Sequence, residues 1–252
     1  MEPVLSVREL CKTFHREGRP DIFAVRRVSF DLFPGEILGI VGESGSGKST
    51  LARCITRLTD PDSGTVMALG RDMTRAGAGE LREAYRSMQM IFQNPAGSFN
   101  PRRTLGWSAA ESLRSAGMAA SERTKIIRGL FAECGLSEEL IGRYPHEVSG
   151  GQCQRAAIAR ALTAGPKILI CDEATSALDV TVQKQIVELL GRLRREKALA
   201  LLFICHNLAL VQQFCDRVLV MRDGEVVEEG RPDDVIAFPH HEYTRRLIDA
   251  VL

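Results

Sequence analysis

The sequence lacks the marks of membrane-spanning, secreted and metal-binding chains. Its longest uninterrupted apolar run, residues 198–205, is far shorter than the roughly 20 residues that cross a bilayer as a helix. The first ten residues show neither the basic start nor the long apolar stretch of a signal peptide. The seven cysteines form no C-x-x-C pair and no cluster with histidine. We therefore expect a cytosolic protein whose cysteines are mostly buried apolar residues, with neither a disulfide framework nor a zinc site.

The chain also lacks an excess of one charge. Lysine plus arginine number 33 and aspartate plus glutamate 32, which leaves a formal net charge of +1. This balance gives no basic footprint and disfavours a nucleic-acid partner. With 252 residues and no internal repeat, the chain can form one large domain or a core with a modest subdomain.

Strand-like and helix-like segments alternate along most of the chain. The first forty residues read as strands, and the mostly apolar strands EILGIV, KILICDE and LALLFIC are each followed by helical spacing. This predicts an α/β fold with a mainly parallel sheet covered on both faces. Strand-like runs vanish from 94 to 147, so we expect a helical subdomain inserted at approximately 94–160.

The segment GESGSGKS, from Gly42 through Ser49, fits the phosphate-loop pattern G-x-x-x-x-G-K-[ST] between a strand and a helix. Glycines let backbone N–H groups close around phosphates, and the helix N-terminus adds partial positive charge. Lys48 would reach the outer phosphates, and the Ser49 hydroxyl would bind Mg²⁺. The candidate nucleotide-binding residues here are Gly42, Glu43, Ser44, Gly45, Ser46, Gly47, Lys48, Ser49 and Thr50.

Two carboxylates end the apolar strand in KILICDE. We expect Asp172 to orient the water shell of the metal and Glu173 to act as general base toward the attacking water. The alternative for Glu173 is a cap on the turn that follows. The chain has no Asn-Lys-x-Asp segment of a GTPase, whereas a small-molecule kinase stays possible on these two motifs alone.

Six segments taken in order resemble the nucleotide-binding subunit of an ATP-binding cassette (ABC) transporter: GESGSGKS, IFQNP, VSGGQ at 148–152, KILICDE, SALD at 176–179 and ICHN. The resemblance covers essentially all of residues 1–252 as one ABC ATPase domain. It implies a P-loop core of the RecA type, an N-terminal antiparallel β portion, an α-helical subdomain and a C-terminal helical tail at 231–252. It also decides against the kinase.

The resemblance implies further site residues. Gln93 would contact Mg²⁺ and the attacking water, so Ser49, Gln93 and Asp172 form the expected ligand set for the Mg²⁺ of ATP. His206 would bond the γ-phosphate. Phe14 would stack on adenine, with a core role for Phe14 and competition from Phe23 left open.

A second glycine-rich segment, Ser149 to Gln152, begins a helix, although the chain already has a phosphate loop. In the head-to-tail dimer of this family, Ser149, Gly150, Gly151 and Gln152 would face the γ-phosphate held by the other subunit. A simple serine N-cap is the alternative; it accounts for Ser149 but not for the paired glycines. Asp179 would lie in a loop that crosses to that subunit.

Two stretches, 91–102 and 240–252, are similar to the importer branch for peptides, nickel or metal chelates. We expect an ATPase at the cytoplasmic membrane face, bound peripherally to two membrane-spanning permease subunits and served indirectly by an extracytoplasmic solute-binding protein. Phe99 and Trp107 are candidates for the groove that receives the permease, with a core role for Trp107 left open. A second, non-identical ATPase is preferred as partner, with a homodimer possible. The alternative function is a non-transport ABC ATPase on ribosomes or DNA.

Several positions depart from the family pattern. Val148, Cys153, Cys205 and Asn207 replace residues more usual there, and none of these changes removes a group assigned to phosphate or metal. Residues 240–242, His-His-Glu, could suggest a metal site, but a solvated helix start is the simpler reading and no metal is assigned there.

Overall fold

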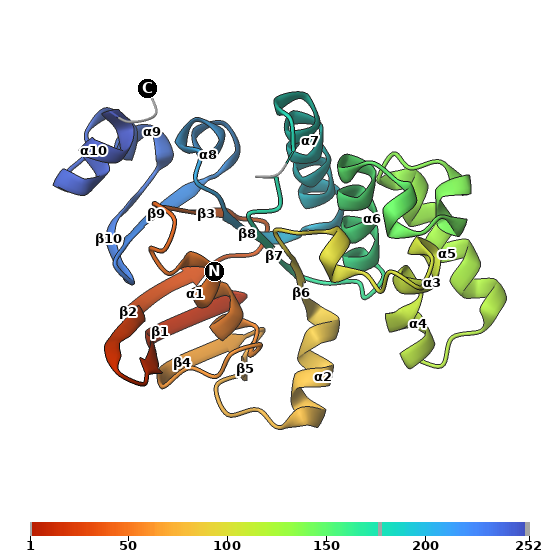
Figure 1. Cartoon of the computed structure of the whole chain (residues 1–252), viewed down its shortest axis with the longest axis horizontal. Helices are drawn as coiled ribbons and strands as arrows, with labels where there is room; N and C mark the ends of the chain where they lie inside the picture. Colours follow the sequence, from red (N-terminus) through yellow and green to blue (C-terminus); the bar gives the residue numbers. More distant parts are fainter. Residues whose placement is uncertain (1, 176–177, 250–252) are drawn as a thin grey trace.

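A six-stranded sheet forms the centre of the computed structural model, which describes residues 2–175 and 178–249 (Figure 1). Five strands run parallel and the edge strand β10 runs antiparallel to β9. Their order is β10 (Glu225–Gly230), β9 (Arg217–Arg222), β3 (Ile37–Val41), β8 (Ala200–Ile204), β7 (Ile168–Asp172) and β6 (Met88–Ile91). The expected mainly parallel sheet is confirmed.

An antiparallel sheet lies beside the central one. Its order is β2 (Arg19–Leu32), β1 (Leu5–Arg16), β4 (Ser63–Ala68) and β5 (Arg71–Asp72). Together with helix α1 (Lys48–Ile55) it encloses one hydrophobic cluster against one face of the central sheet. The strands expected from the alternation of the first forty residues are therefore confirmed.

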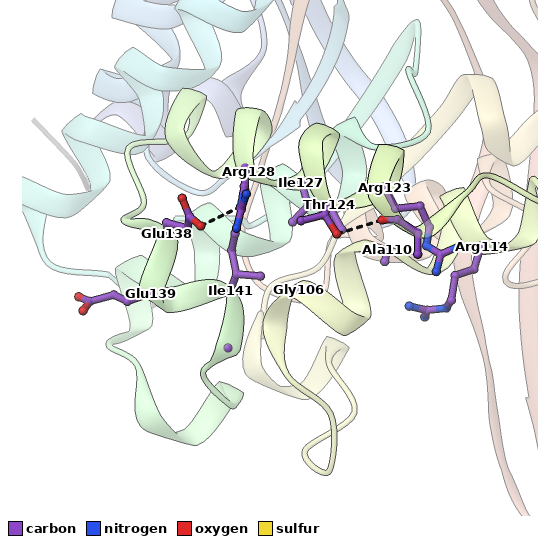
Figure 2. A pocket seen from close by; sticks show the side chains of 12 residues that line it. Gly106, Ala110, Arg114, Arg123, Thr124, Ile127, Arg128, Glu138, Glu139 and Ile141 are labelled. Carbon is purple, nitrogen blue, oxygen red and sulfur yellow. Dashed lines mark hydrogen bonds and ion pairs between the residues drawn. The ribbon is translucent and has the colours of Figure 1, made fainter.

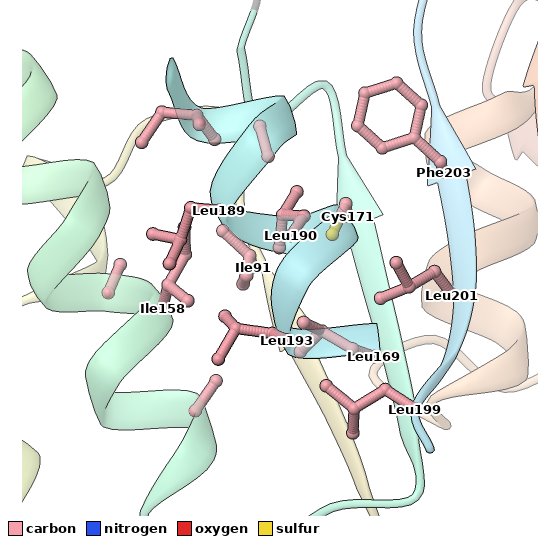
Figure 3. Close-up of a cluster of buried hydrophobic side chains, with 14 of the residues drawn as sticks. Ile91, Ile158, Leu169, Cys171, Leu189, Leu190, Leu193, Leu199, Leu201 and Phe203 are labelled. Atoms are coloured by element: carbon pink, nitrogen blue, oxygen red, sulfur yellow. The ribbon is translucent and has the colours of Figure 1, made fainter. Parts of the chain in front are cut away.

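Helices cover the opposite face of the central sheet. They are α6 (Gly150–Leu162), α7 (Val180–Lys197) and α8 (Leu208–Phe214). Alternate residues of one strand serve the two faces: Leu169 and Cys171 pack under these helices, and Ile168 and Ile170 pack toward the antiparallel sheet. Figure 3 shows Leu169 and Cys171 of β7 opposite Leu190 of α7. Burial on both faces explains why β7 is apolar from Ile168 to Cys171.

Short helices fill the region between β6 and α6, at the right of Figure 1. They are α3 (Leu105–Ala109), α4 (Glu111–Ser115) and α5 (Ala120–Glu133), with 3₁₀ turns η1 (Ala96–Ser98), η2 (Glu138–Gly142) and η3 (Pro145–Glu147). Helical spacing was expected here and is present, but it is interrupted at Ala110, which caps both α3 and α4.

One helix was not identified from sequence. Helix α2 (Ala78–Ser87) leads directly into the edge strand β6. Only Ala84 of α2 is buried, so its pattern carries little of the apolar periodicity that marks a helix. At the other end of the chain, α9 (Pro232–Ala237) and α10 (Glu242–Asp249) lie beside β9 and β10. Within the described residues, no helix is long and apolar enough to span a membrane.

The cysteines behave as the sequence suggested. Six of the seven are buried, and Cys11 alone is half-buried. Burial raises the pKa of Cys54 and Cys153 to about 11 and that of Cys134 and Cys171 to about 12. These thiols are therefore protonated and serve as apolar packing groups.

Candidate nucleotide site

The phosphate loop joins β3 to α1 in a shape that two glycines make possible. Gly42 and Gly47 have φ angles of 151° and 104°, which side chains rarely adopt. A Cβ on Gly42 would lie 2.2 Å from the Met221 carbonyl oxygen, and one on Gly47 would lie 2.0 Å from that of Ala24. Backbone from β9 and β2 thus packs directly against the loop, so neither glycine can be replaced without moving it.

Lys48 lies inside this loop and is 4% exposed. Its Nζ donates to the carbonyl oxygens of Gly42 and Glu43, at 2.9 and 2.7 Å, and to Ser46 Oγ at 3.2 Å. Burial lowers the pKa of Lys48, opposed by the nearby charges of Glu173 and Asp172. An incoming phosphate would offer the ammonium stronger, charge-assisted hydrogen bonds than these neutral oxygens do.

Ser49 and Asp172 meet beside the loop, although 123 residues separate them. Ser49 Oγ donates to Asp172 Oδ1 at 2.8 Å, and burial raises the pKa of the Asp172 carboxyl. These two residues and Gln93 line one hollow at the carboxyl edge of the sheet, with Arg53. A hydroxyl, a carboxylate and an amide are oxygen ligands of the kind that Mg²⁺ prefers, so the residues present fit a magnesium ion.

Glu173 and Gln93 form a second pair next to the first. Gln93 Nε2 donates to Glu173 Oε2 at 2.6 Å. The backbone of Glu173 has a φ of 48°, an uncommon conformation for a non-glycine residue, and its N–H donates to the Ile204 carbonyl oxygen. Such conformations cluster at functional sites because the surrounding structure must hold them.

The other two residues expected at the nucleotide are exposed. His206 follows β8, the strand beside β3, which places it at the same sheet edge as the loop. Phe14 is 39% exposed on β1, with Lys12 Nζ 5.6 Å from its ring centroid. The competing Phe23 is 51% exposed, and the Arg26 guanidinium lies 4.8 Å from its ring centroid. Both rings are therefore accessible, and exposure does not decide which of them would stack on adenine.

The signature segment, Ser149–Gln152, is exposed at Ser149 and Gly150, and its two polar side chains bond its own backbone. Ser149 Oγ accepts from the Gln152 N–H at 3.3 Å, and Gln152 Oε1 accepts from the Ser149 N–H at 3.0 Å, which forms a capping box on α6. Within the described residues, no hydrogen bond or ion pair joins Ser149–Gln152 to the phosphate loop. The structure therefore does not bring the two glycine-rich segments of this chain together.

The serine N-cap was not expected to account for the paired glycines, and packing within the chain accounts for one of them. A Cβ on Gly151 would lie 2.6 Å from Val182 Cγ1. Close packing of α6 on α7 therefore accounts for Gly151. A Cβ on Gly150 would meet only Leu178 Cδ2, at an ordinary 3.6 Å.

Asp179 caps α7, and its Oδ1 accepts from the Val182 N–H at 2.9 Å. This local role accounts for the aspartate without a second subunit, while its exposed position leaves it accessible to one. Two residues of the SALD segment, 176 and 177, lie outside the described residues.

Residues near the C-terminus also reach the site. The backbone N–H groups of His240 and His241 donate to the carboxylate of Glu228, and His241 Nδ1 accepts from the Tyr243 N–H, so these histidines begin a helix. Tyr243 OH in turn accepts from the Glu43 N–H of the phosphate loop at 2.9 Å. The sequence predicted a resemblance to the importer branch and a helix start for this segment, but not its contact with the phosphate loop.

A separate hollow lies among the short helices, between α3–α4, α5 and η2 (Figure 2). Arg128 is paired there with Glu138 at 2.7 Å, and none of the lining residues is a predicted site residue.

Of the two aromatic candidates for permease contact, Phe99 is 4% exposed and is thus a core residue. Trp107 is 39% exposed and lies between the guanidinium groups of Arg103 and Arg114.

Comparison with known proteins gives consistent matches. The chain is 49% identical over 230 residues to the oligopeptide transport ATP-binding protein OppF of Salmonella typhimurium, covering 90% of this chain and 69% of OppF. It is 46% identical over 257 residues to the glutathione import ATP-binding protein GsiA of the same organism, covering 99% of this chain and 41% of GsiA. A solved dimer of the ATP-binding cassette MJ0796, in a post-hydrolysis state bound to ADP and Pi, has a TM-score of 0.82 at 29% identity and covers 90% of this chain and 98% of that one. A family model described as ABC transporter matches residues 25–176, and this chain belongs to the ABC transporter family as an ATP-binding ATPase subunit.

Proposed function

We propose that this chain powers an importer of peptides by binding and hydrolysing ATP at the phosphate loop. The observation that carries the proposal is the pairing of Ser49 with Asp172 and of Gln93 with Glu173 beside Lys48. The names of OppF and GsiA support transport of peptides, glutathione being a small peptide, and favour a transporter over a ribosomal or DNA-bound ATPase. The names of these relatives give no such support for transport of nickel.

Each residue of the site has a chemical task in this proposal. The loop N–H groups, the α1 N-terminus and Lys48 bind the phosphates, and Glu173 accepts a proton from the attacking water. Gln93 orients the Glu173 carboxylate through its 2.6 Å bond. Bound Mg²⁺, held by Ser49, Asp172 and Gln93, would neutralise charge that develops on the phosphates. His206 would form a hydrogen bond with the γ-phosphate, and Phe14 would stack on adenine.

The exposed signature segment supports a head-to-tail dimer. Its Ser149–Gln152 capping box begins α6, and this helix N-terminus is exposed at Ser149 and Gly150, which makes it a suitable partner for the γ-phosphate of a second cassette. The dimeric state of the MJ0796 cassette is consistent with this arrangement. A non-identical second ATPase remains our preferred partner, and a homodimer is the alternative.

The permease would dock beside the site, at the cytoplasmic membrane face. A groove lined by Leu58, Tyr85 and Phe92 on one side and by Glu111, Ser115 and Arg160 on the other lies between the central sheet and the short helices. Phe92 directly precedes Gln93, so a permease helix in this groove would act on the residue that orients Glu173. We keep residues 94–160 as the helical subdomain that would move with the permease, and the solute-binding protein as an indirect partner.

The Glu173→Gln variant tests this function. We expect unchanged ATP affinity but a loss of hydrolysis of roughly a hundredfold or more, because the amide cannot accept the proton. The exposed Glu122→Gln in α5 is the matched control and should hydrolyse ATP at the normal rate. Near-normal turnover of the Glu173 variant would exclude Glu173 as the general base. Co-purification of the chain with ribosomes instead of permease subunits would exclude the transporter role.

A further inference from the structure

A tyrosine from the last helix holds the phosphate loop from outside. Tyr243 OH accepts the Glu43 backbone N–H at 2.9 Å across 200 residues of sequence. Glu43 is the second residue of the loop and directly follows Gly42, which is pressed against the Met221 carbonyl. The start of the loop is thus fixed by two contacts from the C-terminal part of the chain.

Tyr243 is itself held firmly. It is 4% exposed, and its ring carries the Arg222 guanidinium of β9 at 5.1 Å. Directly before it, the backbone N–H groups of His240 and His241 donate to the Glu228 carboxylate of β10, at 2.8 and 3.1 Å. The position of the phenol is therefore set by two strands of the central sheet, which makes Tyr243 a rigid acceptor.

Two groups share the task of holding Glu43. Tyr243 holds its N–H, while Lys48 Nζ holds its carbonyl oxygen at 2.7 Å. When phosphate arrives, Lys48 turns its donors from neutral carbonyls to the charged phosphate oxygens, which are stronger acceptors. The bond to Tyr243 is independent of Lys48, so it persists through this exchange.

We propose that Tyr243 is a positioning residue that keeps the phosphate loop in its binding shape once Lys48 is engaged by ATP. A loop that keeps its shape binds with less loss of conformational freedom, which improves affinity. The inference rests on ATP binding at this loop. It predicts a defect in ATP affinity with little change in the chemical step, since Tyr243 touches neither Glu173 nor Asp172 by any bond within the described residues.

The test is Tyr243→Phe in the full chain, which removes the hydroxyl and keeps the ring under Arg222. We expect faster hydrogen exchange at the Glu43 amide, with and without ATP. We also expect the Kd for Mg-ATP to rise roughly threefold to tenfold, the range for loss of one hydrogen bond. In the assembled transporter, KM for ATP should rise while kcat stays within about twofold.

Tyr144→Phe is the matched control, because Tyr144 is exposed just before η3, stacks on His146, and has no hydrogen bond to the loop within the described residues. It should change neither the Glu43 exchange rate nor the Kd. If Tyr243→Phe behaves like this control, the inference is overturned. Faster exchange spread over the whole chain instead of the loop would also overturn it, as a general loss of stability. If the wild-type chain does not bind ATP, the proposed function fails, and exchange at Glu43 still tests the contact.

Discussion

The phosphate loop and the signature segment both combine glycines with a helix N-terminus, but they are held in opposite ways. The loop is fixed by backbone and side chains from β2, β9 and α10, with Lys48 buried inside it. The signature segment has a capping box of its own and is open to solvent at Ser149 and Gly150. The loop is therefore held by contacts within one chain, and the exposed signature segment is the part that, in our proposal, faces a second subunit.

Loss of the loop lysine should have the largest effect. We expect Lys48→Ala to weaken ATP binding by the isolated chain roughly a hundredfold, since it removes two charge-assisted bonds to phosphate at about 1.5 kcal/mol or more each. Equilibrium titration with ATP measures this. The exposed Lys125→Ala in α5 should bind normally, and equal affinity of the two variants would show that Lys48 does not bind phosphate.

The signature serine should show the reverse pattern. We expect Ser149→Arg to leave ATP affinity of the isolated chain within about twofold, while closed dimers disappear, because a long cation would fill the place of the partner's phosphate. Analytical ultracentrifugation with ATP in the Glu173→Gln background measures the dimer. Ser121→Arg, on exposed α5, is the control. A large loss of affinity in the isolated chain would contradict the division between the two segments.

Within the signature segment, substitution of the two glycines should affect stability differently. Gly151→Ala brings a Cβ within 2.6 Å of Val182 Cγ1, and valine is stiff. We therefore expect a loss of about 1–2 kcal/mol in the free energy of unfolding, or about 2–8 °C in Tm. Gly150→Ala, with only a 3.6 Å contact, should be as stable as wild type and serves as its control. Equal melting temperatures would remove the packing explanation for Gly151.

The smallest effect concerns the cap of α7. We expect Asp179→Ala to lower the free energy of unfolding by about 1 kcal/mol, because the Val182 N–H loses its acceptor. Asp179→Asn keeps an acceptor and should be nearly neutral. Urea denaturation of both variants provides the measurement. If dimer closure falls in the Asn variant at unchanged stability, Asp179 also acts between subunits.

Much of the loop could be predicted because its chemistry is local in sequence. The pattern from Gly42 to Ser49 predicts both the helix start and the phosphate-binding lysine. The apolar run of a strand that is buried on both faces also indicates where the strand ends, and Asp172 and Glu173 lie at such an end. The unforeseen features depend on contacts between distant segments. The space beside Gly151 is set by Val182, and the acceptor for Glu43 comes from Tyr243. Helix α2 was missed because it buries only Ala84.

The buried thiols also make the wild-type chain a convenient background for spectroscopic labels. Reaction with maleimides requires an accessible thiolate, and six of the seven cysteines are buried, with burial raising the pKa of Cys205 to about 12. Only Cys11 needs replacement, for example by serine. A single cysteine introduced at Ser121 or Lys125 would then carry one fluorophore per subunit, so that the approach of two cassettes can be followed as energy transfer in real time.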